Sequence, residues 1–150
     1  MVSSDILNKA KKYCAYQERS QQEVRDKLYS LGLHKSDVEE TLALLVTEDY
    51  VNEQRFAVAY AGGKFRIKKW GKIKIKQGLK QKKVSDYCIR YALNSISFGD
   101  YRKCISEIIS EKNARVTEKD MVKRKAKIAR QVISRGFEPT LVWDLLNDAD

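Results

Sequence analysis

Ten lysines and arginines lie within the stretch from Lys64 to Lys83, and no aspartate or glutamate interrupts them. We call this stretch the basic segment. The whole chain has 30 basic and 20 acidic residues and a formal net charge of +10, so the basic segment alone accounts for the excess. Cationic side chains at this density favour a polyanionic partner, because neutralising phosphates releases their condensed counterions. The sequence therefore predicts a polyanion-binding surface.

The residues that we expect to contact this partner are the cations of the basic segment and one tryptophan among them. They are Lys64, Arg66, Lys68, Lys69, Trp70, Lys72, Lys74, Lys76, Lys80, Lys82 and Lys83. A helix over residues 72–83 would place four of the lysines in one stripe, at positions 72, 76, 80 and 83. Like charges at this spacing weaken a helix slightly, so the stripe does not serve helix stability. The alternative is an ordinary solvated face, although such faces mix both signs.

A secondary basic patch is predicted further along the chain, where an ordinary basic helix surface explains the residues equally well. It consists of Lys123, Arg124, Lys127 and Arg130.

The sequence offers little support for a catalytic site or a metal site. His34 is the only histidine, so neither a zinc site nor a nucleophile with a histidine base can be nominated. The tripeptide Gly62-Gly63-Lys64 resembles the end of a phosphate-binding loop, but Phe65 replaces the Ser or Thr that such loops require. We expect a protein that is not an enzyme, with no catalytic residue, cofactor or metal.

The elements that carry these residues are predicted by an apolar pattern that occurs three times. The spacing repeats after 51 and then 53 positions without a gap, which indicates an internal repeat. Within each copy, apolar residues at i and i+4 come before and after a break, which predicts helix, tight turn, helix. The three copies are Val24, Leu28, Leu33, Val38, Leu42; Ile75, Leu79, Val84, Ile89, Leu93; and Ile128, Val132, Phe137, Val142, Leu146.

A further helix is predicted before each pair, over residues 5–16, 52–65 and 100–113. The expected fold class is therefore all-α, with three tandem three-helix repeats that resemble helix-turn-helix units. We place the repeats at residues 1–50, 51–97 and 98–150, with the basic segment in the second. A single unit of this size buries little apolar surface, so neighbouring units should stack.

Capping residues support these boundaries. Gly32 and Gly136 suit the left-handed conformation that ends a helix, and Pro139 suits a first helical turn. Three N-terminal caps are expected, at Ser20-x-x-Glu23, Ser36-x-x-Glu39 and Thr117-x-x-Asp120.

One segment has a conflicting pattern. Residues 72–76 alternate between lysine and isoleucine, which is typical of a strand. We predict helix there, because Ile75 and Leu79 match helical positions in both other repeats and no second strand is available as a partner.

Composition bears on the compartment. No stretch approaches the roughly 18 apolar residues of a membrane span, and residues 1–12 lack a signal-peptide core. Cys14, Cys88 and Cys104 form no C-x-x-C pair, which fits reduced thiols in the core. We expect a cytoplasmic protein that does not contact membranes.

The chain also resembles the RecX family of bacterial recombination regulators. The match is sharpest over residues 19–84 and runs in order along the chain. It comprises Arg19-Ser20, Glu23-Val24 and Lys27-Leu28-x-x-x-Gly32, then Asp49 to Glu53 leading to Phe56-Ala57, then Lys64-Phe65-Arg66 with Lys69-Trp70-Gly71. The resemblance implies an elongated, curved array of three three-helix repeats.

The resemblance further implies a regulatory protein that binds the RecA filament on DNA and inhibits RecA ATPase, filament extension and strand exchange. The implied roles are DNA repair, DNA recombination and SOS control. We expect a monomer whose partners are the RecA filament and single- or double-stranded DNA. The chain departs from the family pattern at Asp49, where glycine is common. It also departs at Gly62-Gly63, where we expect the helix to kink or end about one turn early.

Two alternatives stay open. The chain could be a helical nucleic-acid-binding module that acts without RecA, although a lysine-rich helix suits phosphates better than bases. It could also be an adaptor for an acidic protein, with Trp70, Phe98 and Trp143 as anchors, although each aromatic is more readily explained as a core residue.

Overall fold

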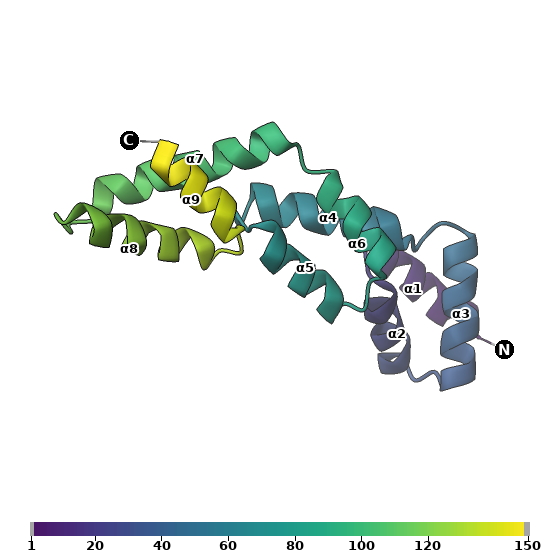
Figure 1. Ribbon diagram of the computed structural model, residues 1–150. Helices are drawn as coiled ribbons and strands as arrows, with labels where there is room; N and C mark the ends of the chain where they lie inside the picture. The colour runs from purple at the N-terminus through teal and green to yellow at the C-terminus, as the bar shows by residue number, and fades with distance from the viewer. Residues whose placement is uncertain (1, 149–150) are drawn as a thin grey trace. The chain divides into compact units, whose positions relative to one another are not determined.

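The computed structural model describes residues 2–148, and every helix or strand assigned within them is an α-helix, nine in all (Figure 1). The predicted all-α class with its groups of three helices is confirmed. The helices are α1 (Ser4–Tyr16), α2 (Gln21–Ser30), α3 (Lys35–Thr47), α4 (Glu53–Arg66), α5 (Lys72–Gln81), α6 (Asp86–Asn94), α7 (Phe98–Arg115), α8 (Met121–Ile133) and α9 (Pro139–Asp148).

The chain packs as two compact units. The first contains the residues up to Tyr60 together with Gly78–Ala92, and the second contains Ala61–Gln77 together with the chain from Leu93 onward. Helices α4 and α5 therefore each contribute residues to both units. The division into three repeats along the sequence stays a prediction.

The first unit has a continuous apolar core where α1 packs against α2 and α2 against α3 (Figure 1). The i, i+4 spacing of the repeat pattern turns its apolar side chains toward this core. Leu7, Leu33 and Tyr50 pack on the core as partly buried residues. The buried members are Ala10, Cys14, Val24, Leu28, Val38, Leu42, Leu45 and Val51.

The second unit has its core where α7, α8 and α9 pack against one another. Tyr101 is the largest fully buried side chain of the described residues. Its ring lies 5.7 Å from the ring of Phe65 and 5.4 Å from that of Phe137, measured between centroids. Across the three copies of the repeat pattern, every position is buried except Leu33 and Leu93, which are half-buried. The repeat pattern therefore identified core positions correctly.

The helix boundaries confirm some capping predictions and correct others. Ser20 and Glu23 form the reciprocal capping box of α2, and α9 begins at Pro139. The predicted cap at Ser36 is wrong, because α3 begins one residue after His34, directly beyond the Gly32 turn. The predicted cap at Thr117 is also wrong. Asp120 itself caps α8 by accepting a hydrogen bond from the Lys123 amide at 3.1 Å, and aspartate caps better than threonine.

Two ambiguous stretches are helical. Residues 72–76 belong to α5, so the repeat outweighs the local alternation. The expectation that Gly62-Gly63 ends the fourth helix early is wrong, because α4 continues to Arg66. A Cβ atom on Gly62 would lie 2.6 Å from the Arg66 guanidinium, so Gly62 leaves room for this side chain to fold back along the helix.

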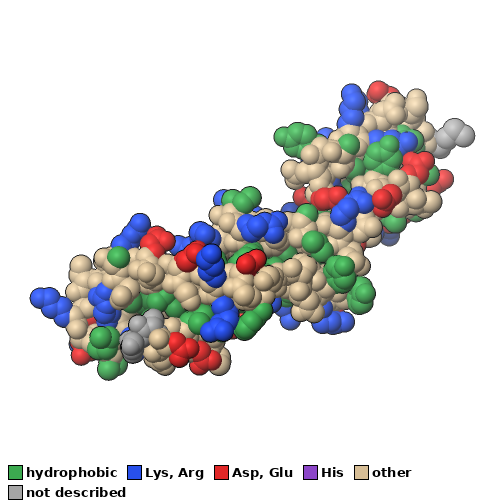
Figure 2. All heavy atoms as spheres, turned by 90° about the horizontal axis from the view of Figure 1, so that it is seen from above, with side chains coloured by type: hydrophobic (Ala, Val, Ile, Leu, Met, Phe, Trp, Pro, Cys, Tyr) green, Lys and Arg blue, Asp and Glu red, His purple; other side chains and the backbone are tan. Residues whose placement is uncertain are grey.

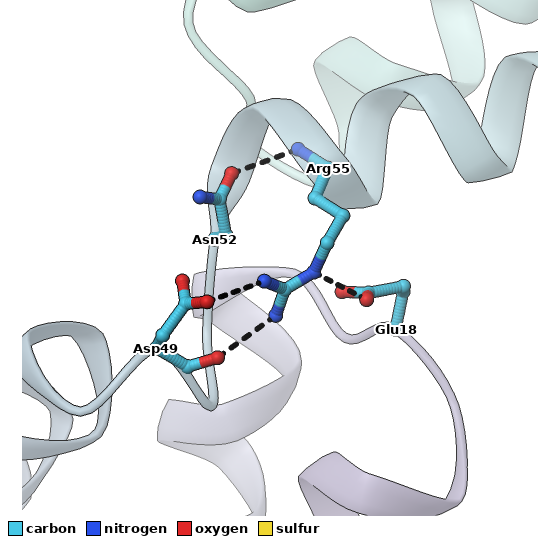
Figure 3. A network of polar contacts seen from close by, with 4 residues as sticks. All are labelled: Glu18, Asp49, Asn52 and Arg55. Atoms are coloured by element: carbon cyan, nitrogen blue, oxygen red, sulfur yellow. Dashed lines mark hydrogen bonds and ion pairs between the residues drawn. The ribbon is translucent and has the colours of Figure 1, made fainter.

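Asp49 departs from the family pattern and yet keeps a left-handed backbone, with φ of 64°. Aspartate tolerates this region better than most residues. The Arg55 guanidinium binds the Asp49 side chain at 3.1 Å and its backbone carbonyl at 3.0 Å, and it pairs with Glu18 at 2.5 Å (Figure 3). The Asn52 side chain accepts a hydrogen bond from the Arg55 backbone amide at 2.9 Å, directly before α4 begins at Glu53. This network joins the α1–α2 and α3–α4 connections within the first unit.

The three cysteines are free and buried, which confirms them as core residues. Burial raises the pKa of all three thiols, so they stay protonated. Within residues 2–148, no helix combines the length and apolar character needed to cross a membrane.

Candidate polyanion-binding surface

The basic segment comprises the end of α4, the α4–α5 connection, α5 and the turn after α5. The junction between the α4–α5 connection and α5 is held in place by the turn between α8 and α9. The Gly71 amide donates to the Arg135 carbonyl at 2.9 Å, and the Ile73 amide donates to the Gly136 carbonyl at 3.0 Å. A Cβ atom on Gly71 would lie 2.2 Å from the Gly136 carbonyl carbon, so only glycine allows this approach.

The start of α5 is closed by a buried tyrosine. The Lys72 amide donates to the Tyr101 hydroxyl at 2.9 Å, and that hydroxyl donates in turn to the Glu138 carboxylate. Burial, and then the hydrogen bond to Glu138, raise the pKa of Tyr101 far above its usual range. The Lys72 and Ile73 amides at the start of α5 are thus bound by protein groups.

Three lysines of the basic segment lie over aromatic rings. The Lys64 and Lys74 ammonium groups lie 4.8 and 4.6 Å from the centroid of the Trp70 ring. The Lys72 ammonium lies 5.0 Å from the centroid of the Tyr101 ring. Such contacts stabilise by about 0.5–1 kcal/mol at exposed sites and restrict the side chains. These three lysines and Trp70 are half-buried.

The remaining cations of the segment are exposed, with one exception. The Lys82 ammonium pairs with Glu23 at 3.4 Å, so part of its charge is neutralised within the first unit. No sequence pattern predicts this pair, because 59 positions separate the two residues. The exposed members are Arg66, Lys68, Lys69, Lys76, Lys80 and Lys83.

Two of the exposed lysines have positive φ angles, 56° at Lys69 and 61° at Lys83. Lys69 follows α4, where its amide donates to the Phe65 carbonyl at 3.1 Å. Lys83 follows α5, where its amide donates to the Lys80 carbonyl at 2.9 Å. Left-handed backbone at a helix end usually belongs to glycine.

The secondary basic patch is only partly available for binding. Arg124 donates to the backbone carbonyls of Asn113, Val116 and Glu118 and to the Asn113 side chain, which ties the α7–α8 connection together. Lys123, Lys127 and Arg130 are exposed on α8.

Two aromatic residues outside the basic segment are less buried than expected. Phe98 is 61% exposed and Trp143 is 37% exposed, so their interpretation as core residues is wrong. On the face drawn in Figure 2, hydrophobic side chains are visible among the projecting lysines and arginines. No group of three or more metal-binding side chains occurs in the part of the chain that the structure describes.

Comparison with known proteins identifies the family. The family model for the first three-helix domain of RecX matches residues 7–45, and that for the second three-helix domain matches residues 52–93. The regulatory protein RecX of Pasteurella multocida is 30% identical over 140 residues, which cover 92% of this chain and 84% of that protein. This chain belongs to the RecX family.

Other RecX proteins are longer. The RecX protein of Clostridium acetobutylicum is 29% identical over 134 residues, which cover 87% of this chain and 62% of the relative. The match to the Bacillus licheniformis protein covers 96% of this chain and 55% of that relative. This chain thus spans little more than half the length of several RecX relatives.

A solved RecX structure supports the fold assignment. The crystal structure of RecX from Lactobacillus salivarius matches with a TM-score of 0.89 at 23% sequence identity, and it covers 97% of this chain and 94% of that chain. At this identity the match supports the all-helical fold and says nothing about individual binding residues.

Proposed function

We propose that this RecX chain binds the RecA filament on DNA and inhibits RecA ATPase, filament extension and strand exchange, and thereby limits recombination, repair and the SOS response. Family membership supports the RecA partner. The observation that supports contact with a polyanion is the set of exposed cations between Arg66 and Lys83. No acidic residue lies among them. The chain acts by binding, as a cytoplasmic monomer, and performs no chemistry of its own.

The α4–α5 connection is suited to this role because backbone hydrogen bonds fix its end without a bound partner. Within the second unit, the hydrogen bonds of Gly71, Lys72 and Ile73 fix the connection that carries Lys68 and Lys69. Ordering such a connection only on binding would cost affinity. The proposed contacts are therefore charge contacts from a rigid backbone, made with DNA phosphates, with acidic groups of RecA, or with both.

The test is charge reversal at two exposed lysines of α5. Lys76→Glu together with Lys80→Glu should abolish inhibition of ATP hydrolysis by RecA on single-stranded DNA, because attraction becomes repulsion. Lys72 is left unchanged, since its ammonium packs over Tyr101. The helical circular dichroism spectrum should stay the same. The measurement is the steady-state ATPase rate against added RecX chain.

The matched control is Lys35→Glu with Lys103→Glu, which makes the same charge change at exposed positions outside the basic segment. This control should inhibit as the wild type does. Full inhibition by the α5 variant would rule out these lysines as contacts. If the wild-type chain binds DNA and leaves RecA unaffected, the RecA-independent nucleic-acid-binding module becomes the better explanation.

A further inference from the structure

Lys69 and Lys83 combine an unfavourable backbone conformation with exposed side chains. In an L-residue with left-handed backbone, Cβ crowds the neighbouring carbonyl oxygen, so glycine is the favoured residue there. Among the described residues, only one other non-glycine position has positive φ, and that is Asp49. The Asp49 side chain has a structural partner in Arg55. The two lysines need a different explanation.

The turn at Lys83 is the same turn that other helix pairs build with glycine. The Gly32 amide donates to the Tyr29 carbonyl at 3.0 Å, and the next amide donates to the Leu28 carbonyl at 3.3 Å. The Lys83 amide and the next amide make the same two bonds after α5, at 2.9 and 3.2 Å. Gly136, after α8, has φ of 98°. Lysine therefore occupies the position that the first and third pairs give to glycine.

Neither lysine side chain offsets this cost with a hydrogen bond or an ion pair among the described residues. Both are exposed, and neither makes a hydrogen bond or an ion pair with any residue from 2 to 148 through its ammonium group. A cation near a helix C-terminus interacts favourably with the helix dipole. The last turns of α4 and α5 already contain cations. These are Lys64 and Arg66 in α4 and Lys80 in α5. The helix dipole therefore does not require a cation at Lys69 or Lys83, and a role in binding remains as an explanation for the two side chains.

We infer that Lys69 and Lys83 each contact a backbone phosphate of DNA. Lysine binds phosphate as a point charge, whereas protein–protein interfaces are depleted in lysine. Nine of the ten cations in the basic segment are lysines. The inference rests on the DNA contact within the proposed function and adds the residues that make it.

The test replaces each lysine by glycine, which removes the charge and relaxes the backbone together. The variants are Lys69→Gly, Lys83→Gly and the double substitution. Binding to a fluorescein-labelled single-stranded oligonucleotide is measured by anisotropy over a range of salt concentrations, without RecA. Each lost phosphate contact should make the slope of log affinity against log salt shallower by about 0.7. In the double variant this slope should therefore be shallower by about 1.4.

Stability separates a binding role from a folding role. The midpoint of urea unfolding should stay the same or rise in each glycine variant, since glycine relieves the left-handed strain. A lower midpoint would mean that these lysines stabilise the turns, and it would overturn the inference. An unchanged salt slope, or absence of DNA binding by the wild-type chain, would also overturn it.

Lys35→Gln is the control for loss of one charge elsewhere, and it should leave the slope unchanged. An equal loss of slope in this control would overturn the inference, because any lysine would then suffice. The RecA ATPase assay is run separately on the wild-type chain. Inhibition of RecA with unaltered slopes in the glycine variants contradicts only the phosphate contacts. The predicted slopes without inhibition contradict only the proposed action on RecA.

Discussion

Gly63 and Gly71 have different physical roles that depend on their neighbours. Gly71 lies where two backbones meet, and a Cβ atom there would overlap Gly136. Gly63 lies inside α4, and a Cβ atom there would meet nothing within 4 Å. The exposed Lys68 and Lys69 lie between these two glycines in the sequence. One glycine thus permits the packing of the connection, and the other only weakens a helix.

Replacing each glycine by alanine should change stability in opposite directions. Gly71→Ala should lower the free energy of unfolding by about 2–4 kcal/mol, because backbone atoms cannot move aside as a flexible side chain can. Gly63→Ala should raise it by about 0.5–1 kcal/mol through helix propensity. Urea unfolding followed by circular dichroism measures both. Equal stability of the two variants would contradict the close approach at Gly71.

The start of α5 depends on a contact from α7. Helix α5 has no acidic residue in its first turn, and Gly71 before it has no side chain that could cap the helix. The hydroxyl of Tyr101 takes that role by accepting from the Lys72 amide, and Glu138 binds the hydroxyl proton. A tertiary contact therefore determines the residue at which α5, the helix with the lysine stripe, begins.

Removal of this hydroxyl should cost stability in a pH-dependent way. Tyr101→Phe should lower the free energy of unfolding by about 1–3 kcal/mol at neutral pH, because the buried groups lose their partner. The pKa of Tyr101 is raised in the folded protein, so the unfolded chain releases this proton first as the pH rises above 10. Stability from Tyr101 is therefore complete below pH 10 and declines above it, by about 1.4 kcal/mol per pH unit.

The measurement is the difference in unfolding free energy between wild type and Tyr101→Phe at pH 8, 10 and 11. The difference should be constant up to about pH 10 and smaller at pH 11. Comparison with the variant cancels the titration of the other tyrosines and of the cysteines. A difference that grows with pH would have the wrong sign for a raised pKa and would exclude the proposed hydrogen bonding.

At the scale of the whole molecule, features with a local or periodic cause could be predicted from the sequence. The repeat placed thirteen of its fifteen apolar positions in the core and identified α5 as helix despite its alternating lysines. Contacts between distant residues could not be predicted, because they depend on packing. Examples are the Lys82–Glu23 pair and the carbonyl contacts of Arg124. The predicted N-terminal cap at Ser36 is wrong because the Gly32 turn leads directly into α3, which begins at Lys35.

The placement of charge across the molecule predicts how it binds duplex DNA. Outside the basic segment the chain has equal numbers of acidic and basic residues, so attraction to phosphates should come from this segment. Four to six phosphate contacts give a slope of roughly −4 to −5 for log affinity against log salt. Lysines contact phosphates and carry little sequence information, so two unrelated duplexes of equal length should bind within about threefold of each other.

Anisotropy titrations with both duplexes at several salt concentrations measure the slope and the preference together. A preference of about a thousandfold would indicate base readout of the kind made by helix-turn-helix proteins. A slope near −1 would show that the basic segment lies away from the DNA and would leave acidic groups on RecA as its partner. A steep slope without preference would mean that the DNA backbone receives the charge of the basic segment while RecA provides the specificity.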